Sequence, residues 1–494
     1  MAQIADAVAR QLYGQGYGAE YLPLSEEARL AKLIHKLKGE NHLLVLDNLE
    51  SVTGAALAIQ HTLDGSEQAR LRDFVDKLAG GKTLLLLGSR GREEWLVGRF
   101  SKSSIYELPG LDREAASLLA ERLLRRLGKP EYASHPDHQQ PFQQLLKLLA
   151  GYPLALEIVL ANLARQTPAA LLAAFTEGVA GVDVAAEGKL WEDKTKSILR
   201  CVEYSHSNLS PDAQALLACL TPFTGVFNAN WITQYTSNLQ AQPALAHLPY
   251  DQWGLVLKEA MDWGLLTAHE AGGGYLRLQP ILPYFLRQRL GDPAQAATRA
   301  AVETAFRTHY DDVGEALAQL IKSREAQQKQ LGQALINLEY ENLMTALRLA
   351  LAQRQSFRNL YSCLAEYLRA GQRFQEEKSI CELILAQQEK YPPQAIAGEI
   401  GQDFFIVYGN LGNRNLNLQL YAEAKETLNS ALNLIEQLQS VSPEQRGNWL
   451  GTTYHQLGIV AQAQRDWQTA VSHYQNALAI FIEYNDRHSQ ARTY

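Results

Sequence analysis

The hydrophobic pattern divides the chain into a mixed start and a long helical remainder. Leu43–Leu46 and Thr83–Leu87 are short, continuous apolar runs, and such runs are typical of strands buried on both faces of a sheet. Three amphipathic stretches that predict helices alternate with these runs: Ile4–Leu12, Glu26–Leu37 and Glu67–Leu78. Strands that alternate with helices predict a parallel sheet. We therefore expect an α/β domain over residues 1–110.

Two details complete this expected domain. Ser66 is the predicted N-cap of the third helix, because a hydroxyl there accepts a bond from a free backbone N–H. Ser104–Leu108 is a third, weaker strand, since Pro109 and Gly110 follow it.

Residues 111–180 carry only helical signals. Asp112 is a predicted N-cap for a helix over Arg113–Arg126. Two further helices, Phe142–Ala150 and Leu154–Ala164, are separated by Gly151-Tyr-Pro153. We expect a separate helical domain here.

Residues 190–292 predict a compact domain with a hairpin. Ser210-Pro211 has the form of an N-cap followed by proline at the first helical position. A second helix is expected at Tyr250–Trp263. Leu265–His269 and Tyr275–Leu278 then flank a run of glycines, which is typical of a β-hairpin. Helices followed by such a hairpin indicate a winged-helix-like domain.

Residues 295–494 are wholly helical and contain an internal repeat. The positions Gly412, Ala424, Leu428 and Ala431 recur 46 residues later as Gly458, Ala470, Tyr474 and Ala477. Small residues at these spacings allow two antiparallel helices to approach closely, which is the logic of tetratricopeptide repeats. Tyr361–Ala386 is a weaker unit, with Ala365 at the small position and Glu377 and Cys381 as departures. We expect an α-solenoid that is incomplete at the C-terminus.

Composition and charge narrow the class of protein. Hydrophobic residues make up 46% and charged residues 20%, which favours globular domains. The net charge of −7 argues against binding to nucleic acid or to an acidic membrane surface. Four cysteines without a C-x-x-C pair indicate reduced thiols in a cytoplasm, and Gly151 and Pro153 interrupt the most apolar region, which excludes a membrane span there.

The strand ends carry the candidate chemistry. Asp47 follows the first buried strand, and the carboxyl ends of strands in open α/β sheets are where ligands bind. A carboxylate there suits Mg²⁺ on a nucleotide, although a turn aspartate after a core strand is the plain alternative. Arg90 follows the second strand and has the charge of a γ-phosphate sensor, with a surface ion pair as its alternative.

Gly80-Gly-Lys-Thr83 is not a phosphate loop. The G-x-x-x-x-G-K-[ST] pattern requires glycine where Asp76 stands. A helix also precedes this segment and a strand follows it, which is the reverse of a phosphate loop. We expect a turn into a strand.

The order of these motifs is specific. Asp47-Asn48 after an apolar strand is followed by Leu-Gly-Ser-Arg90, Leu108-Pro-Gly-Leu111, Gly151-Tyr-Pro153, the hairpin domain and the repeats. In this order the chain resembles the STAND class of signal-transduction NTPases, in its NB-ARC-like branch with a repeat sensor. The resemblance implies a mainly α protein with an N-terminal α/β part: a partial P-loop NTPase-like parallel sheet, a helical domain, a winged helix and the α-solenoid.

The resemblance also implies catalytic roles. Asp47 resembles the Walker B acid that positions Mg²⁺. Asn48 falls where many relatives carry a second acid that polarises water, and an amide cannot act as a base. Glu50 is a possible substitute for that acid. Hydrolysis of ATP by this chain is therefore expected to be weak at most.

Four further residues fall at nucleotide-binding positions of the family. Arg90 resembles the sensor arginine, and Gly151 and Pro153 match the motif that packs near the adenine. Gln279 lies in the segment Leu278-Gln-Pro280, where relatives carry a histidine that reads the ADP phosphates. Glutamine can form hydrogen bonds there but cannot become cationic.

In this family a strand, the phosphate loop and a second strand precede the region that matches residue 1. We therefore expect ATP or ADP with Mg²⁺ in a complete protein, weak or no nucleotide binding by this chain, and a truncated sequence. The leading hypothesis is a cytoplasmic signalling switch, closed with ADP. A protein or peptide ligand on the repeats would favour an ATP-bound, homo-oligomeric form. The alternatives are a non-hydrolysing interaction scaffold with a vestigial NTPase domain and a winged-helix transcription regulator.

Overall fold

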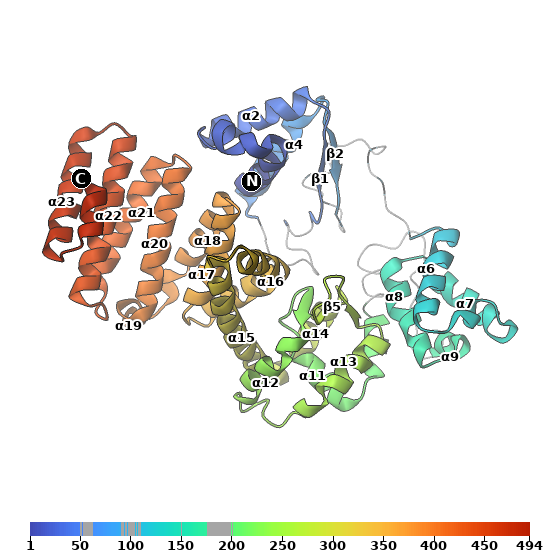
Figure 1. The fold of residues 1–494 in the computed structure, drawn as a ribbon. Coiled ribbons are helices and arrows are strands. Elements are labelled where there is room, and N and C mark those ends of the chain that lie inside the picture. The colour runs from blue at the N-terminus through green and yellow to red at the C-terminus, as the bar shows by residue number, and fades with distance from the viewer. Residues whose placement is uncertain are drawn as a thin grey trace.

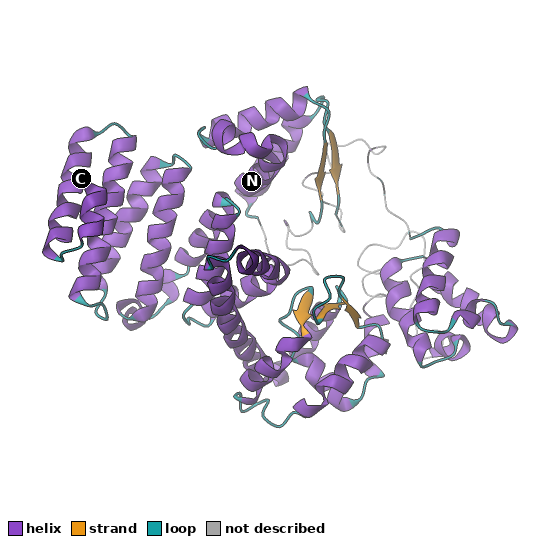
Figure 2. Ribbon diagram, in the orientation of Figure 1, coloured by secondary structure: helices purple, strands orange, loops and turns teal. Residues whose placement is uncertain are grey.

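The chain is mainly helical, with one small parallel sheet and one small antiparallel sheet (Figures 1 and 2). The computed structural model describes residues 1–49, 52, 63–89, 93, 96, 104, 106, 110–149, 151–174, 199 and 201–494. Among the helices in these ranges, none has an apolar stretch of the length that a membrane span requires.

The N-terminal unit, residues 1–89, contains the parallel sheet. Its elements are α1 (Ala2–Tyr13), η1 (Gly14–Gly16), η2 (Tyr17–Tyr21), α2 (Glu26–Gly39), β1 (Leu43–Leu46), α4 (Gly65–Leu78) and β2 (Leu84–Leu87). Strands β1 and β2 pair in parallel, with Leu43 opposite Leu84. The predicted parallel pairing is thus confirmed for these two strands, whereas the strand expected at 104–108 lies largely outside the described residues. Thr83 lies in the bend that directly precedes β2, as expected, and its hydroxyl donates to the Leu37 carbonyl (2.5 Å).

Two expectations for this unit were wrong. The N-cap of α4 is Asp64, whose carboxylate accepts from the backbone N–H groups of Ser66 and Glu67, because a carboxylate two residues before Ser66 reaches both donors. The sheet is also covered on one face only. Leu44 packs with α2 and α4, whereas Val45 is 50% exposed and Leu84 is 68% exposed. The described helices of this unit all lie on the Leu44 face, which leaves the other face apolar and open.

The helical unit, residues 110–174, follows. Its elements are α6 (Arg113–Arg126), η4 (Pro130–Ala133), α7 (Pro136–Leu148), α8 (Pro153–Ala161), η5 (Asn162–Ala164) and α9 (Pro168–Ala173). Asp112 caps α6 as predicted, since its carboxylate accepts from the Ala115 N–H (2.7 Å). The helix expected from Phe142 begins six residues earlier, at Pro136, because proline is favourable in the first turn of a helix.

The hairpin unit, residues 201–295, contains the antiparallel sheet. Its elements are α11 (Pro211–Ala218), β3 (Val226–Asn228), η7 (Ala229–Trp231), α12 (Ile232–Gln240), η8 (Tyr250–Gln252), α13 (Trp253–Asp262), β4 (Leu266–Ala268), β5 (Tyr275–Leu278), α14 (Leu282–Leu290) and η9 (Pro293–Gln295). The predicted hairpin is β4–β5, and Ser210 caps α11 as expected. Strand β3 pairs with the other edge of β5 and was not predicted, because three residues carry too little alternation to reveal a strand.

The helical stack, residues 296–494, forms the rest of the chain. Its elements are α15 (Ala296–Lys322), α16 (Ala326–Ala352), α17 (Arg358–Ala370), α18 (Phe374–Leu385), η10 (Gln388–Lys390), α19 (Pro393–Ala397), α20 (Glu399–Asn417), α21 (Tyr421–Gln437), α22 (Pro443–Ala463), α23 (Trp467–Glu483) and α24 (Arg487–Thr493). Figure 1 shows α20 to α23 side by side, as a helical solenoid requires.

The repeat positions act as the sequence predicted. A Cβ added to Gly412 would lie 2.7 Å from Leu428 Cδ2, and one added to Gly458 would lie 2.5 Å from Tyr474 Cε1. Each glycine therefore accommodates the apolar side chain of the following helix. The paired alanines Ala424 and Ala470 are buried.

The weaker unit, α17–α18, departs from the repeat pattern at Glu377, and this buried carboxylate is ion-paired. Glu377 is fully buried, and its carboxylate accepts from Arg369 (3.0 Å) and lies 3.4 Å from Arg414 Nε. Arg414 belongs to α20, so this charge cluster joins α18 to the next helix pair. A buried carboxylate with two cationic partners is compatible with the core.

A second buried carboxylate joins the helical stack to the hairpin unit. Glu339 accepts from Tyr310 Oη (2.7 Å) and from Asn342 Nδ2 (2.8 Å). Asn342 in turn accepts from the Thr224 N–H (2.7 Å) and donates to the Val226 carbonyl (2.8 Å). Burial raises the pKa of Glu339, although these hydrogen bonds oppose the shift.

The close contact at Gly412 predicts a local loss of stability in G412A. Its methyl group would overlap Leu428, and we expect destabilisation of roughly 1–3 kcal/mol, measured by hydrogen exchange of the α20 and α21 amides. G409A on the same helix is the control, because nothing lies within 4 Å of its Cβ position. Equal effects in the two variants would contradict the packing.

The Glu339 junction predicts a pH-dependent effect of E339Q. Burial raises the pKa of Glu339 in the folded chain above that in the unfolded chain, so the protonated carboxyl group stabilises the fold at low pH. This stabilisation is lost as the pH rises from the unfolded-state pKa through the folded-state pKa. Glutamine does not titrate, so E339Q should gain stability relative to the native chain as pH rises, as measured by thermal unfolding. E341Q, at an exposed position of α16, is the control. A stability difference independent of pH would refute this prediction.

Candidate functional site

The predicted metal ligand Asp47 lies at the carboxyl end of β1, beside the end of β2. Leu49 donates its N–H to the Gly88 carbonyl (3.0 Å), and Gly88 donates to the Leu46 carbonyl (2.8 Å). A Cβ on Gly88 would lie 2.2 Å from Asp47 Oδ1, so only glycine allows the carboxylate to rest there. The structure therefore places the exposed acid against the residue that begins the loop after β2.

Asn48 continues this loop in the left-handed conformation, with φ of 57°, which asparagine tolerates better than most residues. Its side chain is exposed, and buried Leu49 anchors the loop behind it. The other two predicted residues near this edge, Glu50 and Arg90, lie outside the described residues. Ser89, which precedes Arg90, donates from Oγ to Glu93 (2.7 Å).

The predicted adenine-side motif has a defined backbone geometry. Gly151 has φ of 69°, and its carbonyl accepts from the Leu111 N–H (2.7 Å). A Cβ on Gly151 would lie 2.1 Å from the Leu111 carbonyl oxygen. Pro153 then begins α8 at a position that needs no N–H donor. Leu111 and Gly151, which are far apart in the sequence, thus meet backbone to backbone.

Gln279 follows β5 and is only 5% exposed. Its N–H donates to the Leu265 carbonyl (3.1 Å), and its own carbonyl accepts from the Leu282 N–H (2.8 Å). These bonds fix the backbone where the hairpin passes into α14.

The predicted residues occupy three separate places. Figure 1 shows β1, α8 and β5 apart from one another. Within the described ranges, Asp47 forms no hydrogen bond or ion pair with Gly151, Pro153 or Gln279. A nucleotide that contacted all of them would require these parts to come together.

Asp47 suits Mg²⁺ because this ion keeps several waters and takes one or two carboxylates together with phosphate oxygens. The parts of the chain that are described contain no cluster of three or more His, Cys, Asp or Glu for a metal. The four cysteines are free and buried as predicted, and burial raises the pKa of Cys201 and Cys219 to about 12. Thiols that stay protonated in this way are poor nucleophiles and poor metal ligands.

The acidic residues of α13 have structural roles. Glu259 accepts from the N–H (3.0 Å) and the hydroxyl (2.9 Å) of Ser210, which fixes the start of α11. Asp262 pairs with Arg165 of the helical unit at 2.9 Å. A helix occupied in this way, with two acids on its packed side, is poorly suited to read DNA.

A shallow, open depression lies along α21 in the helical stack. It has a volume of about 500 Å³ and is lined by Ala422, Lys425, Glu426, Asn429, Ser430, Asn433 and Gln464. Amide and hydroxyl groups of this kind bond both the N–H and the C=O of a peptide. Sequence reasoning missed this surface because its residues are unremarkable helix-surface types.

Comparisons with known proteins identify no family. No family model matches the chain, and no curated protein matches it. One solved structure that is similar is a Signal Transduction ATPase with Numerous Domains (STAND) protein with a tetratricopeptide repeat sensor from Pyrococcus horikoshii. The identity is 14%, the alignment covers 100% of this chain and 71% of that chain, and the TM-score is 0.37. A similarity at this level establishes neither a shared fold nor a shared function.

The backbone contact at Gly151 predicts an unequal effect of two alanine substitutions. G151A and G128A both place alanine at a positive φ, 69° and 70° respectively. Nothing lies within 4 Å of the added methyl at residue 128, whereas Leu111 obstructs it at residue 151. We expect G151A to lose roughly 2 kcal/mol more than G128A in thermal unfolding. A loss no larger than that of G128A would show that the contact with Leu111 is not tight.

Proposed function

We propose that this chain is the core of a nucleotide-regulated signalling switch. The observation that carries the proposal is the position of Asp47, an exposed carboxylate held against Gly88 at the carboxyl edge of two parallel strands. Ligands of open α/β sheets bind at this edge. The order of the motifs along the sequence supports the same proposal.

In this proposal each predicted residue has a defined task. Asp47 holds Mg²⁺, which supplies positive charge to the phosphates of ATP or ADP. Arg90 contacts the terminal phosphate, and Gly151 and Pro153 pack near the adenine. Gln279 donates a hydrogen bond to the ADP phosphates.

Hydrolysis depends on the residues after Asp47. A general base must accept a proton from water, and the amide of Asn48 cannot do so. Glu50 is the remaining candidate for this step. We therefore propose a protein whose nucleotide acts as a bound signal, with weak hydrolysis at most.

The switch itself is a change of arrangement. ADP would favour a closed form in which β1, α8 and β5 share the nucleotide. A protein or peptide on the helical stack would favour an open, ATP-bound form that assembles with further copies. Each ligand shifts the balance by its difference in affinity for the two forms.

A nucleotide titration tests this proposal. We expect fluorescent ADP with Mg²⁺ to bind this chain more weakly than about 1 µM, because the chain supplies one predicted metal ligand and no phosphate loop. The residual binding should fall further in D47N, which removes the charge that attracts Mg²⁺. D73N, at an exposed position of α4, is the matched control. Tighter binding that D47N leaves unchanged would place the nucleotide elsewhere.

The scaffold alternative would use the shallow depression on α21 as a peptide site. If no Mg²⁺-dependent binding is found and a peptide binds the stack, the chain is an interaction scaffold. The structural roles of Glu259 and Asp262 make the transcription regulator a weaker alternative.

A further inference from the structure

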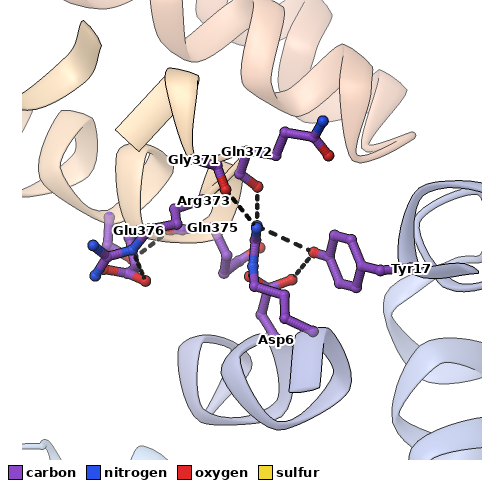
Figure 3. Close-up of polar contacts among 9 residues, drawn as sticks. Asp6, Tyr17, Gly371, Gln372, Arg373, Gln375 and Glu376 are labelled. Atoms are coloured by element: carbon purple, nitrogen blue, oxygen red, sulfur yellow. Dashed lines mark hydrogen bonds and ion pairs between the residues drawn. The ribbon is translucent and has the colours of Figure 1, made fainter. Parts of the chain in front are cut away.

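Helix α1 contacts the helical stack although the two are far apart in the sequence. The guanidinium of Arg10 donates to the Gly371 carbonyl (2.9 Å) and to the Gln372 carbonyl. These two carbonyls lie in the turn between α17 and α18, and α1 packs beside α18. Figure 3 shows the turn facing the N-terminal unit.

The N-terminal unit holds this guanidinium in position. Arg10 Nε donates to Asp6 (2.9 Å), and Tyr17 donates its hydroxyl to the same carboxylate. The Arg10 guanidinium also lies over the Tyr17 ring, 4.6 Å from its centroid. Asp6 and Tyr17 are both buried, so the cation is presented from a rigid base.

The turn is equally well prepared to receive a cation. It follows the C-terminus of α17, where the helix dipole favours positive charge. Gln372 has φ of 53°, a left-handed turn that redirects the backbone between the helices. Behind it, Arg373 donates to Glu376 (2.7 Å) and lies over the Tyr340 ring. Figure 3 shows this second arginine turned away from Tyr17, on the other side of the turn.

We propose that Arg10 is a releasable clasp that holds the N-terminal unit against the helical stack. Its geometry depends on the spacing of two neighbouring carbonyls in one turn. A movement of α18 relative to α17 would separate the carbonyls from the fork of the guanidinium, which bonds both together. A partner that bends the stack would thereby release the N-terminal unit.

The clasp suits release because it is a small contact. The side chain of Arg10 is 21% exposed, so water can replace the two carbonyls when the contact opens. Asp6 and Tyr17 would continue to hold the guanidinium in the released form. The clasp links the helical stack mechanically to the N-terminal unit, which carries the proposed nucleotide site. Only this role in signalling rests on the proposed function.

Spin labels on the full chain test the clasp. K77C on α4 and E382C on α18 place labels at two exposed positions, and the four native thiols are buried. The distance distribution should be narrow in the otherwise native chain. R10A should give a longer and broader distribution, and R10K an intermediate one, because an ammonium lacks the fork that bonds both carbonyls.

R70A is the matched control, since Arg70 is an exposed arginine of the same unit, and its distribution should equal the native one. Y17F weakens the hold on Arg10 and should broaden the distribution modestly, which provides a second variant if R10A fails to fold. An unchanged distribution in R10A, or in both R10K and Y17F, overturns the clasp. That result would leave the nucleotide titration unaffected, so the two proposals fail separately.

Discussion

The parallel pairing of β1 with β2 positions both the candidate site and the helix that contacts the helical stack. It brings the ends of two strands together and sets the Asp47 carboxylate against Gly88. The same sheet packs on α2 and α4, and α1 lies against α2 in the same core. Since α1 carries Arg10, the position of the acid is tied through this core to the turn of the helical stack.

The helices on both sides of that turn are packed against their neighbours. Glu377 joins α18 to α17 through Arg369 and to α20 through Arg414, and the close contact at Gly412 joins α20 to α21. In the other direction, Asn342 joins α16 to β3 of the hairpin unit. Packed cores of this kind move as bodies and transmit displacement. The turn between α17 and α18 is thus a place where strain in the stack would reach the N-terminal unit.

Local structure could be predicted from the sequence where a single residue determines a helix cap or a close contact between helices. Asp112 and Ser210 each cap the predicted helix, and Gly412 and Gly458 each receive the predicted side chain. The start of α4 was misjudged because Asp64 and Ser66 are both capable caps and only geometry decides between them.

Long-range contacts could not be predicted in the same way. Nothing in the sequence around Arg10 indicates Gly371, and the open face of β1 contradicts a pattern typical of burial on both sides. The contact between Leu111 and Gly151 could not be predicted either, although each residue lies in one of the ordered motifs. The places of Asp47 and Gln279 after strands, and of Gly151 between two helices, followed from the pattern. The gathering of the site residues around a nucleotide stays a prediction.

The central claim is that nucleotide binds at the carboxyl edge of β1 and β2. Hydrogen exchange of the full chain with and without millimolar Mg²⁺ and ADP measures this directly. If nucleotide binds at this edge, exchange slows at the amides of Asn48, Leu49 and Ser89, and D47N abolishes the effect. Exchange that is unchanged at these amides, or protection there that persists in D47N, would contradict it.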